Sequence, residues 1–183
     1  MGSGLDWQPA VEAPDLLAPA VAAAFTELDG VAKQTFVAPI DAELADTAAF
    51  CERYAIGLDV SANCVVISGK RGGDARHAAC MVLATTRADV NTVARKRLDV
   101  RKASFLAMDD AVALTGMEYG GITPVGLPRD WPVLVDAAVA ATPWVVIGSG
   151  VRRSKLALPG EALTLLPGAE VVEGLGRPAG QPK

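Results

Sequence analysis

The chain has 183 residues, of which 51% are hydrophobic and 21% charged, with a mean hydropathy of +0.30. This composition supplies a core and excludes a disordered chain, and the length suits one domain with at most a small appendage. The net charge of −4 and the pI near 5.0 argue against a protein coated with nucleic acid.

The first 30 residues predict a helical extension. Pro14 and Asp15 suit the first turn of a helix, and Gly30 suits its end. The apolar stretch inside this segment falls short of the roughly 20 residues that cross a membrane. The acidic start of the chain also lacks the basic leader of a secretory signal. Residues 31–40 alternate partially, which predicts a strand that runs into a turn.

The next segment predicts a helix followed by a hairpin. Asp46 and Thr47 are candidate N-caps for a helix over residues 48–54. Two apolar runs, 62–68 and 75–86, are joined by a glycine-containing turn, which is the pattern of a β-hairpin.

Two more helices and a short strand are predicted after the hairpin. Asp89 can cap a helix over residues 90–98, whose basic last turn complements the helix dipole. A short strand is expected at 102–106, and Asp109 then caps a helix that ends at Gly116. The buried face of this last helix is expected to consist of Ala111, Val112 and Leu114.

The C-terminal third alternates loops with short strands. Residues 117–130 are rich in Gly and Pro and predict an ordered loop. Strands are expected at 132–136, 144–147 and 155–158, and a short helix at 159–165. Strands and helices do not follow a regular βαβ order, which favours an α+β fold with a mixed sheet. Residues 175–183 are expected to form a flexible tail.

The residues that could carry side-chain catalysis are few. The chain has three cysteines, Cys51, Cys64 and Cys80, which form no CxxC pair and lie in apolar patterns. We therefore expect them to pack in the core without a disulfide framework, in a reduced cytoplasmic protein. The single histidine, His77, lies inside a predicted strand. A histidine metal cluster is therefore excluded, no GxSxG elbow exists, and we expect neither a metal nor another cofactor.

Three glycine-rich segments are candidate phosphate or anion loops. Residues 148–153 follow a strand but lack the third glycine of a dinucleotide loop, and 69–74 lack the GK[ST] ending of a phosphate loop. The segment Gly120 to Gly126 differs, because its glycines let the backbone approach a ligand while Pro124 restricts the turn. Such a loop can bind an oxyanion through backbone N–H groups, although a tight structural turn is the ordinary alternative.

Positive charge is concentrated in one segment. Residues 70–102 hold nine basic and three acidic residues, a local charge of +6 against −10 for the remainder. This segment can meet a few phosphates, but from charge alone solvated helix and strand faces explain it better.

The segment from Thr115 to Asp136 resembles the signature of the YbaK family, the relatives of the editing domain of prolyl-tRNA synthetases. A TGM turn ends a helix, a GG[IV][ST]P[FVL]G loop follows, and a PV-hydrophobic-hydrophobic-Asp strand comes next. The resemblance covers roughly residues 31–174 and implies an editing domain with a mixed, curled β-sheet flanked by helices. It also implies a trans-acting aminoacyl-tRNA deacylase, an ester hydrolase without cofactor that contributes to translation fidelity.

The resemblance also implies a set of site residues. Gly120 and Gly121 would donate backbone hydrogen bonds, Pro124 would fix the loop, and Asn63 would orient the substrate. The implied substrate-binding set is Gly121, Ile122, Thr123, Pro124, Asp136, Ser149 and Gly150. Candidates for contact with the acceptor end of a mischarged tRNA are Arg95, Lys96, Arg97, Arg101 and Lys102. A synthetase is a second implied partner, whereas DNA and membranes are not expected.

One position departs from the family pattern. The family carries its functional lysine at the start of the second strand, where this chain has Asn63. An amide can donate a hydrogen bond but contributes no charge. Lys70, Arg71 or Lys102 could replace that charge from elsewhere. The alternative function is therefore an impaired module that binds an aminoacyl-adenosine-like ligand or a synthetase without turnover, and a purely structural interaction domain ranks last.

Overall fold

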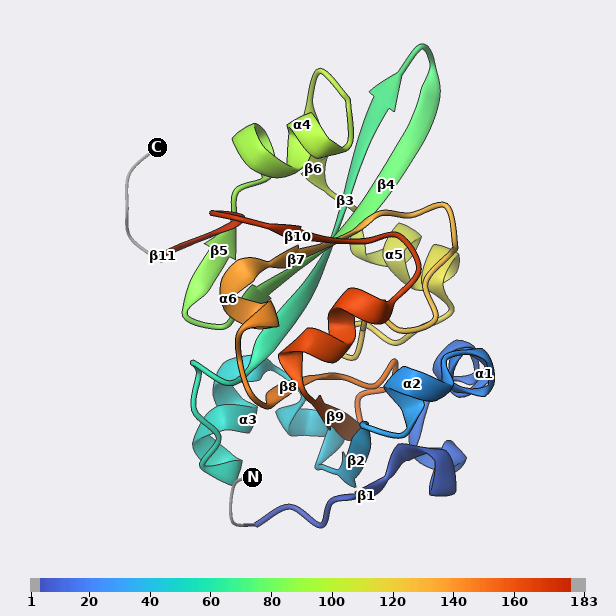
Figure 1. Cartoon of the computed structure of the whole chain (residues 1–183), viewed down its shortest axis with the longest axis vertical. Coiled ribbons are helices and arrows are strands. Elements are labelled where there is room, and N and C mark those ends of the chain that lie inside the picture. The colour runs from blue at the N-terminus through green and yellow to red at the C-terminus, as the bar shows by residue number, and fades with distance from the viewer. Residues whose placement is uncertain (1–3, 179–183) are drawn as a thin grey trace.

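The computed structural model describes residues 4–178, which form an α+β fold as predicted. Its strands are divided among three sheets rather than one (Figure 1). The small sheet has the order β1-β2-β9-β8, with strands Gln8–Pro9, Phe36–Pro39, Ser154–Leu158 and Val145–Gly148. The large sheet has the order β10-β7-β4-β3-β6, with strands Ala169–Val172, Val133–Asp136, Asp74–Leu83, Ala62–Arg71 and Ala103–Phe105. A third, two-stranded sheet pairs β11 (Gly176–Pro178) with β5 (Thr86–Ala88).

Short helices flank these sheets. The α-helices are α1 (Pro19–Glu27), α2 (Asp29–Ala32), α3 (Thr47–Tyr54), α4 (Arg95–Arg97), α5 (Met108–Thr115) and α6 (Ala137–Ala140). The 3-10 segments are η1 (Ala10–Glu12), η2 (Pro14–Leu16), η3 (Ala42–Leu44) and η5 (Gly160–Leu165), and η4 (Val90–Ala94) is a π-helical turn. Within residues 4–178, no helix is long and apolar enough to cross a bilayer.

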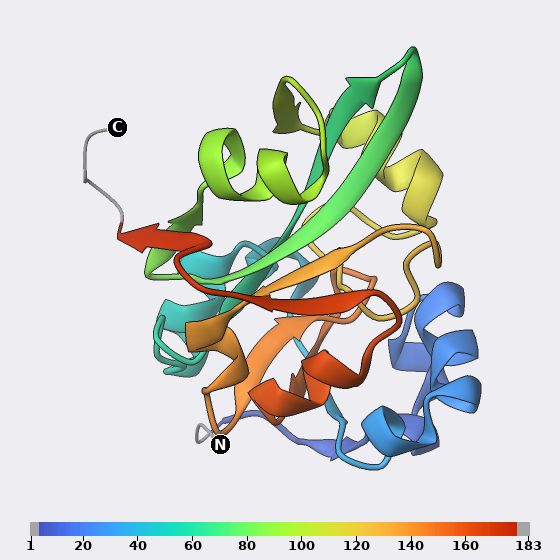
Figure 2. The same ribbon diagram turned by 45° about the horizontal axis from the view of Figure 1, so that its top comes forward.

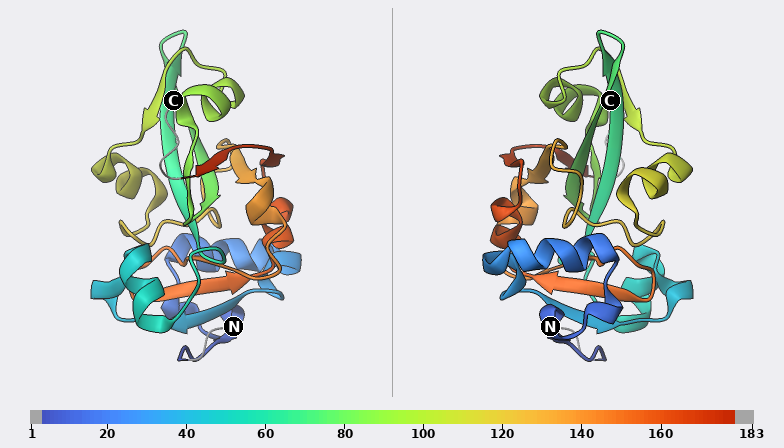
Figure 3. Two further views of the ribbon diagram at one scale, coloured as in Figure 1. Left: turned by 90° about the vertical axis from the view of Figure 1, so that its left-hand side faces the viewer. Right: turned by 90° about the vertical axis from the view of Figure 1, so that its right-hand side faces the viewer.

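The predicted hairpin is the backbone of the large sheet. β3 and β4 pair in register from Ala62↔Leu83 to Arg71↔Asp74, so the strands run through most of the predicted turn. The remaining turn consists of Gly72 and Gly73, both with positive φ. Figure 3 shows the hairpin standing upright over the small sheet, with α4 on one side and α5 on the other. The pairings of β7 with β4 and with β10 are parallel, which makes the sheet mixed.

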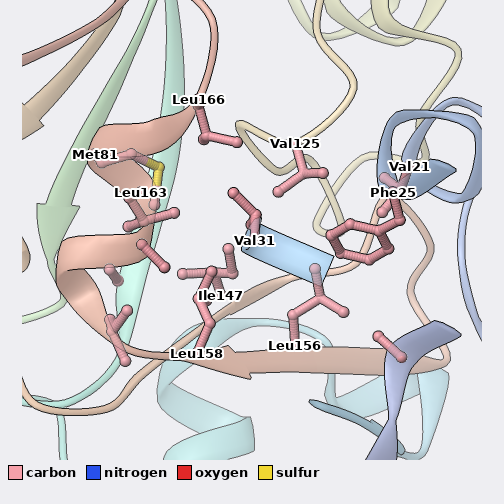
Figure 4. Packing of buried hydrophobic residues seen from close by; sticks show 14 of the residues in the cluster. Val21, Phe25, Val31, Met81, Val125, Ile147, Leu156, Leu158, Leu163 and Leu166 are labelled. Atoms are coloured by element: carbon pink, nitrogen blue, oxygen red, sulfur yellow. The ribbon is translucent and has the colours of Figure 1, made fainter. Parts of the chain in front are cut away.

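The main core lies between the small sheet and the large sheet (Figure 4). Leu156 and Leu158 of β9 are fully buried there, together with Met81 of β4. Val21 and Phe25 of α1 join the same cluster, and β1 pairs with β2. The N-terminal segment is thus part of the fold's core rather than an appended helix, and Figure 2 shows α1 and α2 beside the small sheet.

Three local predictions were wrong. The helix expected through residue 30 is interrupted after η2, and Gly30 lies inside α2 instead of ending a helix. The N-cap of α5 is Ala107, so Asp109 lies in the first turn and does not cap the helix. Val112 and Leu114 are 36% and 48% exposed because this helix buries Ala111 and Thr115 instead.

The start of the predicted tail is also folded. Leu175 is fully buried in the cluster that covers the outer side of the hairpin, and residues 176–178 pair with β5. The tail was predicted because this segment has few apolar residues. A short edge strand needs few of them, so this criterion does not detect it. Residues 179–183 lie outside the described residues.

Truncation of Leu175 tests this assignment. We expect Leu175→Ala to lower the free energy of unfolding by about 2–4 kcal/mol, because a fully buried leucine leaves a cavity when it is removed. Leu165→Ala is the matched control, since Leu165 is 57% exposed and should change stability by less than about 0.5 kcal/mol. Urea denaturation measures both variants, and equal effects would contradict a folded C-terminal strand.

Candidate functional site

A cavity of about 210 Å³ opens where the two larger sheets meet. The start of β3 forms one wall, and a parallel bridge between Ser61 and Val146 connects it to β8. The N-terminus of α3, the glycine loop and the strand β9 complete the lining. The lining residues are Ala45, Asp46, Thr47, Ser61, Ala62, Asn63, Cys64, Tyr119, Gly120, Ile122, Val146, Ile147, Gly148 and Lys155.

The glycine loop lies directly against the backbone that follows β8. The amide of Gly150 donates to the carbonyl oxygen of Gly121 at 2.7 Å. A Cβ on Gly121 would lie 2.6 Å from the backbone of Val151, and one on Gly148 would lie 2.3 Å from the oxygen of Gly121. Two glycines therefore allow this contact, which makes the main chain itself the wall of the cavity.

Gly120 occupies the loop position that faces the cavity. Its φ of +84° favours glycine, and a Cβ there would lie 2.7 Å from the guanidinium of Arg152. Arg152 donates to the carbonyl oxygen of Ala42 at 2.9 and 3.1 Å and to that of Tyr119 at 3.2 Å. This arginine thus ties the loop to the segment before α3. Within residues 4–178 the N–H of Gly120 donates to no protein acceptor.

Asn63 lies opposite the loop on the same cavity. The hydroxyl of Thr47 donates to its side-chain oxygen at 2.6 Å. Thr47 was predicted as a helix cap, but its hydroxyl makes this contact instead, and the side chain of Asp46 makes no capping bond. Because the amide oxygen of Asn63 is occupied, its NH₂ group is the part that can donate to a ligand.

Lys155 supplies the cavity's amine. The side chain is only 7% exposed, and its Nζ donates to the carbonyl oxygen of Ala45 at 2.8 Å and lies 5.3 Å from the centre of the Phe50 ring. Burial lowers the pKa of Lys155 from its ordinary 10.5 to about 8. Cys51 and Asp46 act in the opposite direction, and the positive charge of Arg152 lowers the pKa further.

Cys64 lines the cavity but is a poor nucleophile. Burial is the main cause that raises the pKa of its thiol far above the ordinary 9.0, and neighbouring Cys80 adds to the effect. Burial likewise raises the pKa of Cys80 to about 12. The thiolate is the reactive form of cysteine, so a covalent thiol mechanism near neutral pH is disfavoured here.

The arrangement matches a known family. A sequence model of the aminoacyl-tRNA editing domain matches residues 41–166, which span the chain from η3 to the end of η5. The chain belongs to the aminoacyl-tRNA editing domain family. The resemblance found in the sequence is thereby confirmed.

Solved structures show the same fold. A protein whose proposed role is trans-editing for prolyl-tRNA synthetase has a TM-score of 0.70 at 20% identity, covering 86% of this chain and 97% of that one. A hypothetical protein has a TM-score of 0.71 at 16% identity, covering 83% and 97%. A scaffold protein used for computational epitope grafting has a TM-score of 0.67 at 22% identity, covering 88% and 99%.

The editing domain brings three of the predicted site residues to the cavity. Gly120, Asn63 and Ile122 line it together, although they come from segments far apart in the sequence. Gly121 was predicted as a second backbone donor, but its N–H donates to the carbonyl oxygen of Glu118 at 2.9 Å. That amide is therefore not available to a substrate.

The remaining predicted residues lie outside the cavity lining and support the fold. Thr123 is fully buried, and Pro124 lines a separate hollow beside α1. Asp136 caps α6 through the N–H of Ala138 and also accepts from the N–H of Gly176 at 2.6 Å. The hydroxyl of Ser149 bonds within the β8–β9 turn, and Gly150 packs against Ala18.

The basic residues gather at the far end of the hairpin. Arg95 and Arg101 line a cleft of about 560 Å³ with Lys70 and Arg71 of the hairpin, and Asp99 lies among them. Asp99 forms ion pairs with Arg71 and Arg76, and Arg97 pairs with Glu170. The strand from Asn63 to Lys70 spans about 23 Å at the usual rise per residue. Lys70 and Arg71 thus line this distant cleft and do not line the cavity.

The sequence analysis missed Lys155 as a residue that lines the cavity. It was assigned to a strand without any role, and the replacement for the family lysine was sought in Lys70, Arg71 or Lys102. The available signal was one lysine directly before the apolar residues of the strand SKLAL, every residue of which is buried. His77 packs its ring on Trp131 at 4.9 Å on the large sheet, outside the cavity lining.

Proposed function

We propose that the chain is a trans-editing deacylase that hydrolyses the ester of a mischarged tRNA. The observation that carries this proposal is the shared cavity of Gly120, Asn63 and Lys155 in a chain of the editing family. The N–H of Gly120 and the NH₂ of Asn63 would donate to the ester carbonyl oxygen, where negative charge develops as water attacks. Aminoacyl esters are activated, so oriented donors suffice without a covalent nucleophile.

The mouth of the cavity suits the end of a tRNA. Tyr119 is 55% exposed and lines the cavity beside Gly120, so its ring can stack with the terminal base. From there, the basic cleft would meet phosphates of the acceptor stem, since β3 runs about 23 Å between the two sites. In this proposal the tRNA contact candidates Arg95, Lys96, Arg97, Arg101 and Lys102 would serve binding of the acceptor stem and not the chemistry.

The second candidate function is a binding module without turnover. Asn63 favours it, because an amide stands where the family pattern has a lysine. Such a module would hold an aminoacyl-adenosine-like ligand or a synthetase partner at the same cavity. A purely structural role explains neither the cavity nor the hydrogen bonds by which Arg152 holds the glycine loop.

A panel of mischarged tRNAs tests the deacylase. We expect the native protein to release at least one amino acid well above the buffer rate, and Gly120→Ala to lower that rate at least tenfold because its Cβ approaches Arg152. Gly174→Ala is the matched control, with a similar positive φ but no atom near the new Cβ. Absence of deacylation for every tRNA with protein in excess would eliminate this function.

Asn63→Lys separates the deacylase from the inactive module. If the chain is a deacylase, we expect no increase in its rate. The substitution removes the oxygen that accepts from Thr47, and the new ammonium would repel Lys155. The inactive module predicts no native activity and a gain on this substitution. Asn91→Lys, at an exposed position outside the cavity, controls for added charge alone. Single-turnover deacylation rates decide between the two.

Charge reversal tests the basic cleft. The double variant Arg101→Glu/Lys102→Glu changes one residue that lines the cleft and its neighbour in the sequence. It should raise KM for tRNA several-fold, leave kcat unchanged and reduce the salt dependence of binding by about one unit of slope per lost contact. Lys33→Glu, directly after α2, changes a lysine outside this cleft and should leave KM unchanged. Equal KM values for all three proteins would show that tRNA does not contact this end.

A further inference from the structure

Lys155 is a buried amine without an ion pair. It lies on β9, whose residues alternate between the two sides of the small sheet. Leu156 and Leu158 face the main core, whereas Ala157 belongs to the cluster with Phe50 on the side of α3, where Lys155 also lies. Within the described part of the chain, no carboxylate lies within ion-pair distance of its Nζ.

Charged and titratable groups from two parts of the fold surround this amine. Cys51 and Asp46 act from α3 and its N-cap, and Arg152 acts from the β8–β9 turn. The hydrogen bond to Ala45 uses one N–H. A neutral amine in this position keeps one N–H and its lone pair for other partners, and a pKa near 8 makes that form accessible close to neutral pH.

We propose that Lys155 is the general base of the cavity, taking a proton from the water that attacks the ester carbonyl. This inference rests on the proposed deacylase function and assigns the proton transfer within it. Of the other titratable lining groups, Cys64 holds its proton too tightly, and Asp46 and Tyr119 are exposed to solvent. The amine is also on the same cavity as the two proposed oxyanion donors.

The proposed hydrolysis needs no reactant other than the ester and water. The amine nitrogen of Lys155 accepts a proton from water as the water oxygen forms a bond to the ester carbonyl carbon. The tetrahedral oxyanion is held by Gly120 and Asn63. Its collapse breaks the bond to the ribose oxygen, which takes the proton from the Lys155 ammonium. The products are the free amino acid and the tRNA hydroxyl, and the amine is regenerated.

The pH dependence of kcat/KM tests the assignment. After subtraction of the buffer rate, the native protein should gain close to tenfold per pH unit below about pH 8 and level off above it. Lys155→Met should lose 10²- to 10⁴-fold and lose this rising limb. Lys155→Arg should be equally impaired, because a guanidinium keeps its charge but cannot accept the proton. Lys33→Met, at the exposed residue directly after α2, is the matched control and should behave as the native protein.

Three outcomes overturn the proposal in different ways. If Lys155→Arg keeps the native rate and profile, the residue acts as a fixed cation and is not the base. If both Lys155 variants keep the native rate and profile, Lys155 has no role in the chemistry although the deacylase function stands. If the native protein deacylates none of the tRNAs, the proposed function fails and the base assignment fails with it.

A measurement without substrate checks that the amine is available and the fold intact. Competitive acylation of the native protein across pH, followed by peptide mass spectrometry, should give a midpoint near 8 for Lys155 and higher midpoints for exposed lysines. Since the folded pKa lies below the unfolded value, the native protein should gain stability relative to Lys155→Met as pH rises from about 8 to about 10.5. A Lys155 midpoint equal to that of Lys33 would overturn the assignment.

Discussion

The site depends on one backbone contact, that of the glycine loop with the chain after β8. Gly121 and Gly148 leave no room for a side chain between the two segments, and the bond from Gly150 to Gly121 closes the contact. A wall made of main chain cannot change rotamer, so its free N–H at Gly120 is oriented before any substrate arrives. Preorganised donors of this kind stabilise developing charge without reorganisation, which is what an ester hydrolase without a nucleophilic side chain requires.

The strand β9 places residues of the main core and the proposed base on alternate positions. Leu156 and Leu158 are fully buried in the main core, and this apolar face anchors the strand. Lys155 on the other face is unfavourable for folding, because burial of its charged form costs free energy that the attraction of Asp46 offsets only in part. The apolar face of the strand compensates for that cost, and the lowered pKa of Lys155 is the property that the proposed proton transfer requires. A destabilising residue held in place by its neighbours is typical of a functional position.

The sequence predicted features that neighbouring residues form and missed contacts between segments far apart in the chain. The hairpin, the glycine loop and the family follow from adjacent residues, and Asn63 and Gly120 do share a cavity. The motif also suggested Asp136, whose bonds to Ala138 and Gly176 belong to a helix cap and an edge strand. Lys155 was missed because an apolar strand pattern does not say which of its faces meets a cavity. That depends on how two sheets meet, which no short window of sequence contains.

The N-terminal segment outside the matched editing region shows how such support extends beyond the site. The N–H of Ala18 donates to the carbonyl oxygen of Ser149, and the Cβ of Ala18 lies against Gly150. The first turn of α1 also packs against the far end of the glycine loop, where a Cβ on Gly126 would lie 2.5 Å from the carbonyl oxygen of Ala20. One helix thus holds both segments whose contact forms the cavity wall. Residues outside the cavity lining are therefore part of the geometry that positions Gly120, and α1 supports the proposed site instead of extending from the fold.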